Sequence, residues 1–103
     1  MFGRFGLRDF ILLMHNDAVA QPTPEMWSAY FSFLRERRAF EGGSSIGAGE
    51  TFRKQETPAC PSDHLAGYIR VQANDMSEAR ELLTGNPVFE CGGTVEIREL
   101  PRE

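Results

Sequence analysis

The chain has few of the residues that stabilise small proteins through disulfide bonds or bound metal ions. Its 103 residues include only two cysteines, Cys60 and Cys91, and two histidines. The cysteines match no metal-ligand spacing and make no disulfide framework, and the sequence contains neither H-x-x-x-H nor C-x-x-C. We therefore expect reduced thiols, a cytoplasmic protein, and no metal or other cofactor.

Long hydrophobic runs and an excess of basic residues are also lacking. The apolar run Phe10–Met14 stops at His15, so it is too short for a signal-peptide core, which needs roughly 7–15 residues. No run is long enough to span a bilayer. The formal net charge is −4, which leaves no positive field for nucleic acid or an anionic membrane surface.

The composition that remains is that of an ordinary globular domain. Hydrophobic residues make up 41% of the chain and charged residues 25%, values that argue against disorder. The length predicts a single domain over residues 1–103, large enough to bury a core without disulfides or a bound metal. We expect residues 1–8 to form a flexible leader.

Hydrophobic periodicity and capping residues predict four strands and two helices. Thr23 suits the N-cap of the first helix with Pro24 at its first position, and Gly85 suits the stop of the second helix. Glycines in the second strand predict a bulge. In chain order, the predicted elements are a strand over Phe10–His15, a helix over Pro24–Arg38, a strand over Gly43–Arg53, a strand over His64–Ala73, a helix opened by Asp75, and a strand over Gly93–Leu100.

The predicted order is therefore strand-helix-strand-strand-helix-strand. Its usual solution is a ferredoxin-like α+β sandwich. In that fold the four strands, numbered along the chain, form one antiparallel sheet in the order 4-1-3-2. Both helices cover the same face of the sheet.

This topology brings chemically active residues to one edge of the sheet. The first and third strands are expected to be antiparallel neighbours, so His15 and His64 should lie close together, with Asp17 beside them and Arg53 within a strand or two. A carboxylate that orients an imidazole makes an acid–base pair near neutral pH. We interpret His15, Asp17 and His64 as candidate catalytic residues; the alternatives are strand-end histidines bonded to the backbone and an aspartate that caps a turn.

The sheet face without helices carries Tyr68, Arg70, Glu96 and Arg98, a set too polar for a core. Such a face in a small protein often meets its two-fold mate and leaves a cavity between the two copies. We therefore expect a homodimer built on this face. Tyr68 and Arg70 are candidate substrate-binding residues there, and Arg53 is a third candidate because a guanidinium binds a carboxylate well.

Five segments carry a family resemblance: FILLMHND, WSAYFSFL, FEGGSSIG, HLAGYIRVQANDMSEA and NPVFECGGTVEIREL. In this order the chain resembles the YCII-related superfamily, in its DGPF-domain branch, over roughly residues 9 to 100. The D-G-P-F segment itself is absent, and CPSDHLAGYIRV stands in that region. The resemblance implies a dimeric α+β barrel, a pocket at the sheet edge and dimer interface, and a His/Asp active centre with lyase-type chemistry. The family's usual histidine position is not clearly shared, so His15 and His64 are candidates from topology.

Three functions are compatible with these patterns. The first is a small homodimeric enzyme doing proton-transfer or elimination chemistry on a small anionic metabolite, with His15 and His64 sharing the acid and base roles. The second is a non-catalytic ligand-binding or regulatory module that uses the same cavity. The third is a dimerisation domain without a ligand. A closed cavity that holds both imidazoles favours the first, and a filled interface favours the third.

Overall fold

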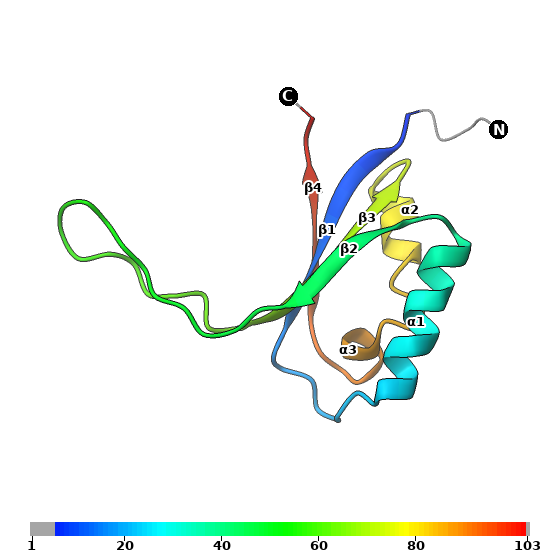
Figure 1. Ribbon diagram of the computed structural model, residues 1–103, viewed down its shortest axis with the longest axis horizontal. Helices are drawn as coiled ribbons and strands as arrows, with labels where there is room; N and C mark the ends of the chain where they lie inside the picture. Colours follow the sequence, from blue (N-terminus) through cyan, green and yellow to red (C-terminus); the bar gives the residue numbers. More distant parts are fainter. Residues whose placement is uncertain (1–5, 103) are drawn as a thin grey trace.

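The computed structural model describes residues 6–102, which form four antiparallel strands and three helices joined by loops (Figure 1). In chain order they are β1 (Arg8–His15), α1 (Pro24–Glu36), β2 (Phe40–Ser45), β3 (Leu65–Ala73), α2 (Met76–Glu81), α3 (Pro87–Glu90) and β4 (Val95–Leu100). Most of the expected leader, residues 1–5, lies outside the described residues, whereas Arg8 already belongs to β1. No helix within residues 6–102 is long and apolar enough to cross a membrane.

The sheet has the predicted antiparallel pairing and strand order. Its order is β2-β3-β1-β4, which is the predicted 4-1-3-2 counted from the other edge. All three helices lie on one side of the sheet (Figure 1). The α+β class and the sheet order are therefore confirmed, and the arrangement is compatible with a ferredoxin-like fold.

The first helix begins as its capping residues predict and ends earlier than expected. The Thr23 hydroxyl accepts a hydrogen bond from the Met26 backbone N–H at 3.2 Å, with Pro24 at the first helical position. The predicted end at Arg38 is wrong, because α1 stops at Glu36. Arg38 has a φ of 56°, a left-handed conformation that turns the chain into β2.

The predicted bounds of the second strand are also wrong. The strand was expected over Gly43–Arg53, but β2 spans Phe40–Ser45 and pairs with β3 from Phe40 onward. The expected glycine bulge is confirmed, because the register shifts between Phe40 and Gly43, where Gly42 has a φ of 111°. After Ser45 the chain leaves the sheet.

Residues 46–64, which we call the arm, project from the end of β2 and return to β3 (Figure 1). Contacts within the arm include a 2.6 Å hydrogen bond from the Thr51 hydroxyl to the Ala59 carbonyl. They also include a 3.3 Å ion pair between Arg53 and Glu56. Phe52 is 85% exposed. Arg53 was expected at the sheet edge beside the histidines and instead lies out on the arm.

The second predicted helix corresponds to α2, which ends at Glu81 and not at the predicted stop, Gly85. The Asp75 carboxylate caps α2 by accepting from the Glu78 N–H at 2.8 Å, as its sequence predicts. Gly85 follows with a φ of 81°. The chain then starts the unexpected helix α3, which the Asn86 side chain caps by accepting from the Phe89 N–H at 3.1 Å.

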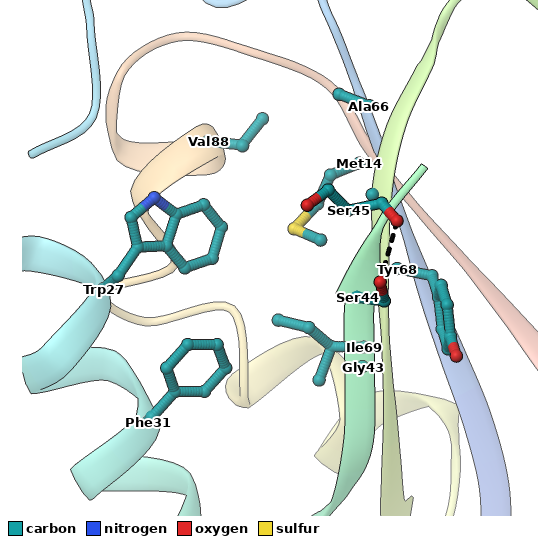
Figure 2. Close-up of a pocket in the computed structure, with 11 residues that line it drawn as sticks. Met14, Trp27, Phe31, Gly43, Ser44, Ser45, Ala66, Tyr68, Ile69 and Val88 are labelled. Atoms are coloured by element: carbon teal, nitrogen blue, oxygen red, sulfur yellow. Dashed lines mark hydrogen bonds between the residues drawn. The ribbon is translucent and has the colours of Figure 1, made fainter. Parts of the chain in front are cut away.

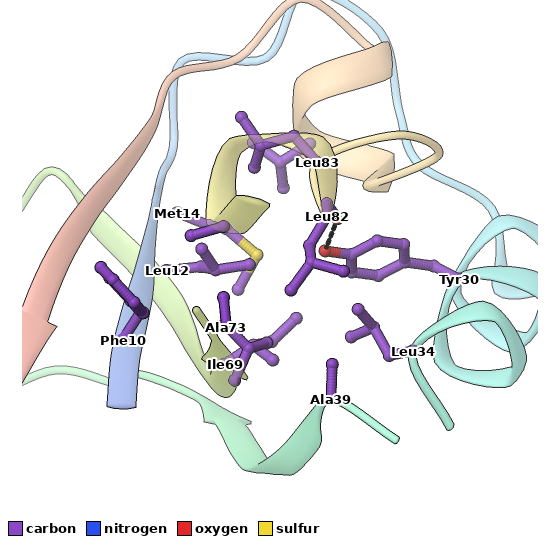
Figure 3. Close-up of a cluster of buried hydrophobic side chains, with 13 residues drawn as sticks. Phe10, Leu12, Met14, Tyr30, Leu34, Ala39, Ile69, Ala73, Leu82 and Leu83 are labelled. Atoms are coloured by element: carbon purple, nitrogen blue, oxygen red, sulfur yellow. Dashed lines mark hydrogen bonds between the residues drawn. The ribbon is translucent and has the colours of Figure 1, made fainter. Parts of the chain in front are cut away.

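The core lies between the sheet and the helices (Figure 3). Alternate residues of β1 and β3 point into it, as the period of two predicts, and Tyr30 and Leu34 meet them from α1. The Tyr30 hydroxyl donates a 2.7 Å hydrogen bond to the Leu82 carbonyl. We call the opposite side of the sheet the outer face; it carries Asp9, Ile11, Leu13, His15, Ala66, Tyr68, Arg70, Gln72, Glu96, Arg98 and Leu100.

Candidate functional site

The two histidines of the chain meet at the end of β1. The β1 ladder shifts register between Met14 and His15, which pairs with Leu65. Beyond β1, the Asn16 N–H donates to the His64 carbonyl at 2.9 Å and keeps the two segments together. The imidazole rings of His15 and His64 lie 4.7 Å apart between centroids, at 72° to each other. The structure thus brings together the two histidines that topology predicted to be neighbours.

Glu96 of β4 completes a cluster with these rings. Its carboxylate Oε1 lies 3.3 Å from His15 Nε2, and its Oε2 accepts from Arg98 at 3.1 Å. The His15 side chain is 20% exposed and that of Glu96 is 37% exposed, so solvent reaches the pair without surrounding it. We call His15, His64 and Glu96 the histidine cluster.

Asp17 was predicted to orient a histidine, and its carboxylate forms its hydrogen bonds with Thr94. One carboxylate oxygen accepts from the Thr94 N–H at 2.8 Å and the other from the Thr94 hydroxyl at 2.7 Å. These two bonds lower the pKa of Asp17, with a smaller contribution from the charge of His15. Asp17 therefore joins the end of β1 to the start of β4, and the carboxylate that contacts His15 is Glu96.

The other predicted residues divide between the outer face and the arm. Tyr68 lies opposite Leu13, and Arg70 lies opposite Ile11, so both share the outer face with the histidine cluster. Arg53 does not, because it lies out on the arm, 59% exposed and paired with Glu56. The positive charge in contact with the cluster is that of Arg98, which donates to Glu96, whereas Arg70 lies opposite Ile11, four residues before His15 in β1.

Glu96 was placed on the polar face by its strand pattern but was not chosen as a site residue. The feature that could have identified Glu96 as a site residue is its position opposite Leu13. Leu13 stands two residues before His15 on the same face of β1. Diagonal neighbours on antiparallel strands lie within reach of long side chains. The register of β1 and β4 was needed to apply that rule.

The carboxyl of Glu96 is expected to titrate below the ordinary range. Hydrogen bonding from Arg98 lowers its pKa most, and the bond to His15 lowers it next. Its negative charge is therefore kept as the pH falls toward that lowered pKa, and is lost below it. Carbon-13 NMR of the side-chain carboxyl should show a larger upward shift of this pKa in Arg98→Met than in His15→Phe. Equal titrations in all three proteins would contradict the contacts.

The cluster combines two groups able to exchange protons with a carboxylate able to orient one of them. Within residues 6–102, no group of three or more His, Cys, Asp or Glu side chains is placed to hold a metal ion. A comparison with protein-family models returns no match for this chain, and neither does a comparison with the curated proteins.

Proposed function

We propose that the protein is a homodimer that binds a small anionic metabolite at the histidine cluster and carries out proton-transfer or elimination chemistry on it. The observation that carries this proposal is the position of His15, whose ring contacts His64 at 4.7 Å and whose Nε2 lies 3.3 Å from the Glu96 carboxylate. The resemblance to the YCII-related superfamily points to the same class of chemistry.

In the proposed reaction one imidazole acts as base and the other as acid. The base takes a proton from a carbon beside the substrate's carboxylate or carbonyl, and the electron pair of that C–H bond forms a double bond. The bond to the leaving group breaks, and the second imidazole, which begins protonated, protonates that group. Glu96 orients His15 and stabilises its charged form after proton transfer. In this proposal Arg70, which shares the outer face, would balance the substrate's negative charge.

Dimerisation is proposed through the outer face. On this face Ile11 lies between Arg70 and Arg98, and Leu13 lies beside Glu96. Apolar side chains in the middle, with charges of both signs around them, suit a two-fold contact in which each patch meets its own copy. The helices leave this face uncovered (Figure 1). A partner sheet would enclose the histidine cluster at the edge of the interface.

Hydrogen–deuterium exchange at a carbon acid tests the chemistry directly. Pyruvate in D2O is a suitable probe, because proton NMR follows the loss of its methyl signal. The wild type is expected to accelerate exchange, and His15→Ala to reduce that acceleration about 100-fold, the usual size of a general-base contribution. Gln72→Ala is the matched control, since Gln72 lies on the outer face at the far end of β3.

A non-catalytic ligand-binding module is the second candidate, favoured by the partly open position of the cluster. Malonate titration distinguishes the two candidates when the imidazole signals of His15 and His64 are followed by NMR. Malonate binding without pyruvate exchange would support the binding module. Absence of both, with His15→Ala indistinguishable from the wild type, would overturn the proposed function.

A further inference from the structure

We propose a second binding site, on the helix side of the sheet, for an uncharged planar compound of one or two rings. A cleft of about 330 Å³ opens between α1 and the edge formed by β2 and β3 (Figure 2). Met14, which lines it, is the neighbour of His15 in β1, and the two side chains point to opposite faces of the sheet. The cleft is thus separate from the histidine cluster and does not depend on the proposed function.

Two glycines lie on the core face of the sheet: Gly67 leaves space beside Met14, and Gly43 allows β2 to approach β3 closely. Gly67 of β3 and Gly43 of β2 both line the cleft where α1 crosses. A Cβ at Gly67 would lie 3.4 Å from Met14 Cε and 3.1 Å from the Ser44 carbonyl, and a Cβ at Gly43 would lie 2.5 Å from the Tyr68 carbonyl. Larger residues at these positions would fill the cleft or push the strands apart.

The walls of the cleft are aromatic and aliphatic. Trp27 and Phe31, one turn apart on α1, have centroids separated by 5.8 Å and planes tilted by 24°. Met14 and Ile69 line the opposite side of the cleft (Figure 2). Offset ring stacking and contacts between a thioether and an aromatic ring both favour a flat ligand with exposed π faces.

The uncharged side chains that line the cleft indicate which class of ligand it can bind. None of the side chains that line the cleft is charged, and the Arg35 guanidinium, 5.9 Å from the Phe31 ring centroid, is outside this lining. A phosphate or carboxylate inside the cleft would therefore lose its hydration without a charged partner in the lining. Figure 2 shows the Ser45 hydroxyl directed toward the cleft, whereas the Ser44 hydroxyl donates to the Ser45 carbonyl. A single polar substituent on the ligand would meet Ser45. The volume falls at the small end of ligand pockets, which suits one or two rings.

Coumarin, an uncharged two-ring compound, tests the proposal against coumarin-3-carboxylate, which has the same rings with a negative charge. Trp27 is the only tryptophan, so its indole N–H signal in nitrogen-15 NMR reports the cleft without ambiguity. We expect coumarin to shift this signal with a Kd at or below about 1 mM, and the carboxylate to bind at least tenfold more weakly. Equal binding of the two probes to the wild type would overturn the proposal.

Ser45 offers a matched pair of variants at the exposed rim. Ser45→Phe is expected to weaken coumarin binding at least tenfold by filling the opening, whereas Ser45→Ala, which leaves the opening free, should change it less than threefold. The competing occupant is the exposed Phe52 of a second copy's arm. Binding of coumarin only in Phe52→Ser, or unchanged binding in Ser45→Phe, would show that the cleft is not a small-molecule site.

Discussion

Replacing Leu13 with aspartate is expected to turn the proposed dimer into a monomer. Leu13 lies in the middle of the outer face, half-buried between Tyr68 of β3 and Glu96 of β4. A second carboxylate beside Glu96 would meet negative charge from its own strand neighbour and from the two-fold copy. Burying that charge without a partner costs several kcal/mol, so dimer affinity should fall at least about 100-fold. Sedimentation velocity over a concentration series measures the change.

Val19→Asp is the matched control for this experiment. It makes a similar apolar-to-acid change at a side chain that is 87% exposed and lies in the loop between β1 and α1. We expect Val19→Asp to sediment as the wild type does. Circular dichroism of both variants checks that the fold is kept. A wild type that sediments only as a monomer at micromolar concentration would contradict the dimer itself.

The second large effect is a loss of stability at alkaline pH that Tyr30→Phe removes. Burial raises the pKa of Tyr30 to about 12 from its ordinary value of about 10. Between these values the unfolded chain gives up the phenol proton and the folded chain keeps it, so stability is full below pH 10 and falls as the pH rises toward 12. Two pH units correspond to about 2–3 kcal/mol of unfolding free energy.

Urea unfolding at intervals from pH 9 to 12 measures how steeply the free energy of unfolding falls with pH. Tyr30→Phe should be less stable at neutral pH by about 1 kcal/mol, because the hydrogen bond to the Leu82 carbonyl is lost, and should lack the alkaline fall. Tyr68→Phe is the control, since Tyr68 is the only other tyrosine and lies on the outer face. A slope unchanged by Tyr30→Phe, or removed by Tyr68→Phe, would assign the titration elsewhere.

The parts of the fold that sequence predicted are those fixed by local chemistry. Thr23 followed by Pro24 predicted the start of α1, and the alternation of β3 predicted which side chains enter the core. The order of elements then led to the sheet order, because few topologies place a strand-helix-strand-strand-helix-strand chain around one core. The short helix α3 was missed, although Asn86 followed by Pro87 repeats the signature of Thr23 followed by Pro24.

The arm could not be predicted from the sequence, because no local pattern marks where β2 ends. Residues 43–53 contain several glycines and no regular alternation, so nothing local marks Ser45 as the last paired residue of β2. The last Cα pair joins Ser45 to Gly67, and one further backbone hydrogen bond joins Ile46 to Ala66 before the two segments separate. Arg53 was consequently placed in the wrong region, since its assignment depended on a strand that does not reach it.

The candidate site was predicted in part. Convergence of His15 and His64 followed from antiparallel pairing of their strands, which requires topology alone. The contact with Glu96 requires the exact register of β1 and β4, and the bonds of Asp17 require the loop conformation at Thr94. That Trp27 lines a cleft follows only from the packing of α1 beside the glycines of β2 and β3.

The arm also bears on the cost of folding. Loop-closure entropy grows with the logarithm of loop length, so shortening residues 46–64 to roughly a quarter would change the folding free energy by only about 1 kcal/mol, in the stabilising direction. The Cα pairing of β2 with β3 ends at Ser45, and Ile46 adds one backbone hydrogen bond to Ala66 at 3.0 Å. The sheet thus carries a segment whose ordering costs free energy and whose contacts add little to the core. We therefore expect a chain with a shortened arm that keeps Ile46, Asp63 and His64 to fold.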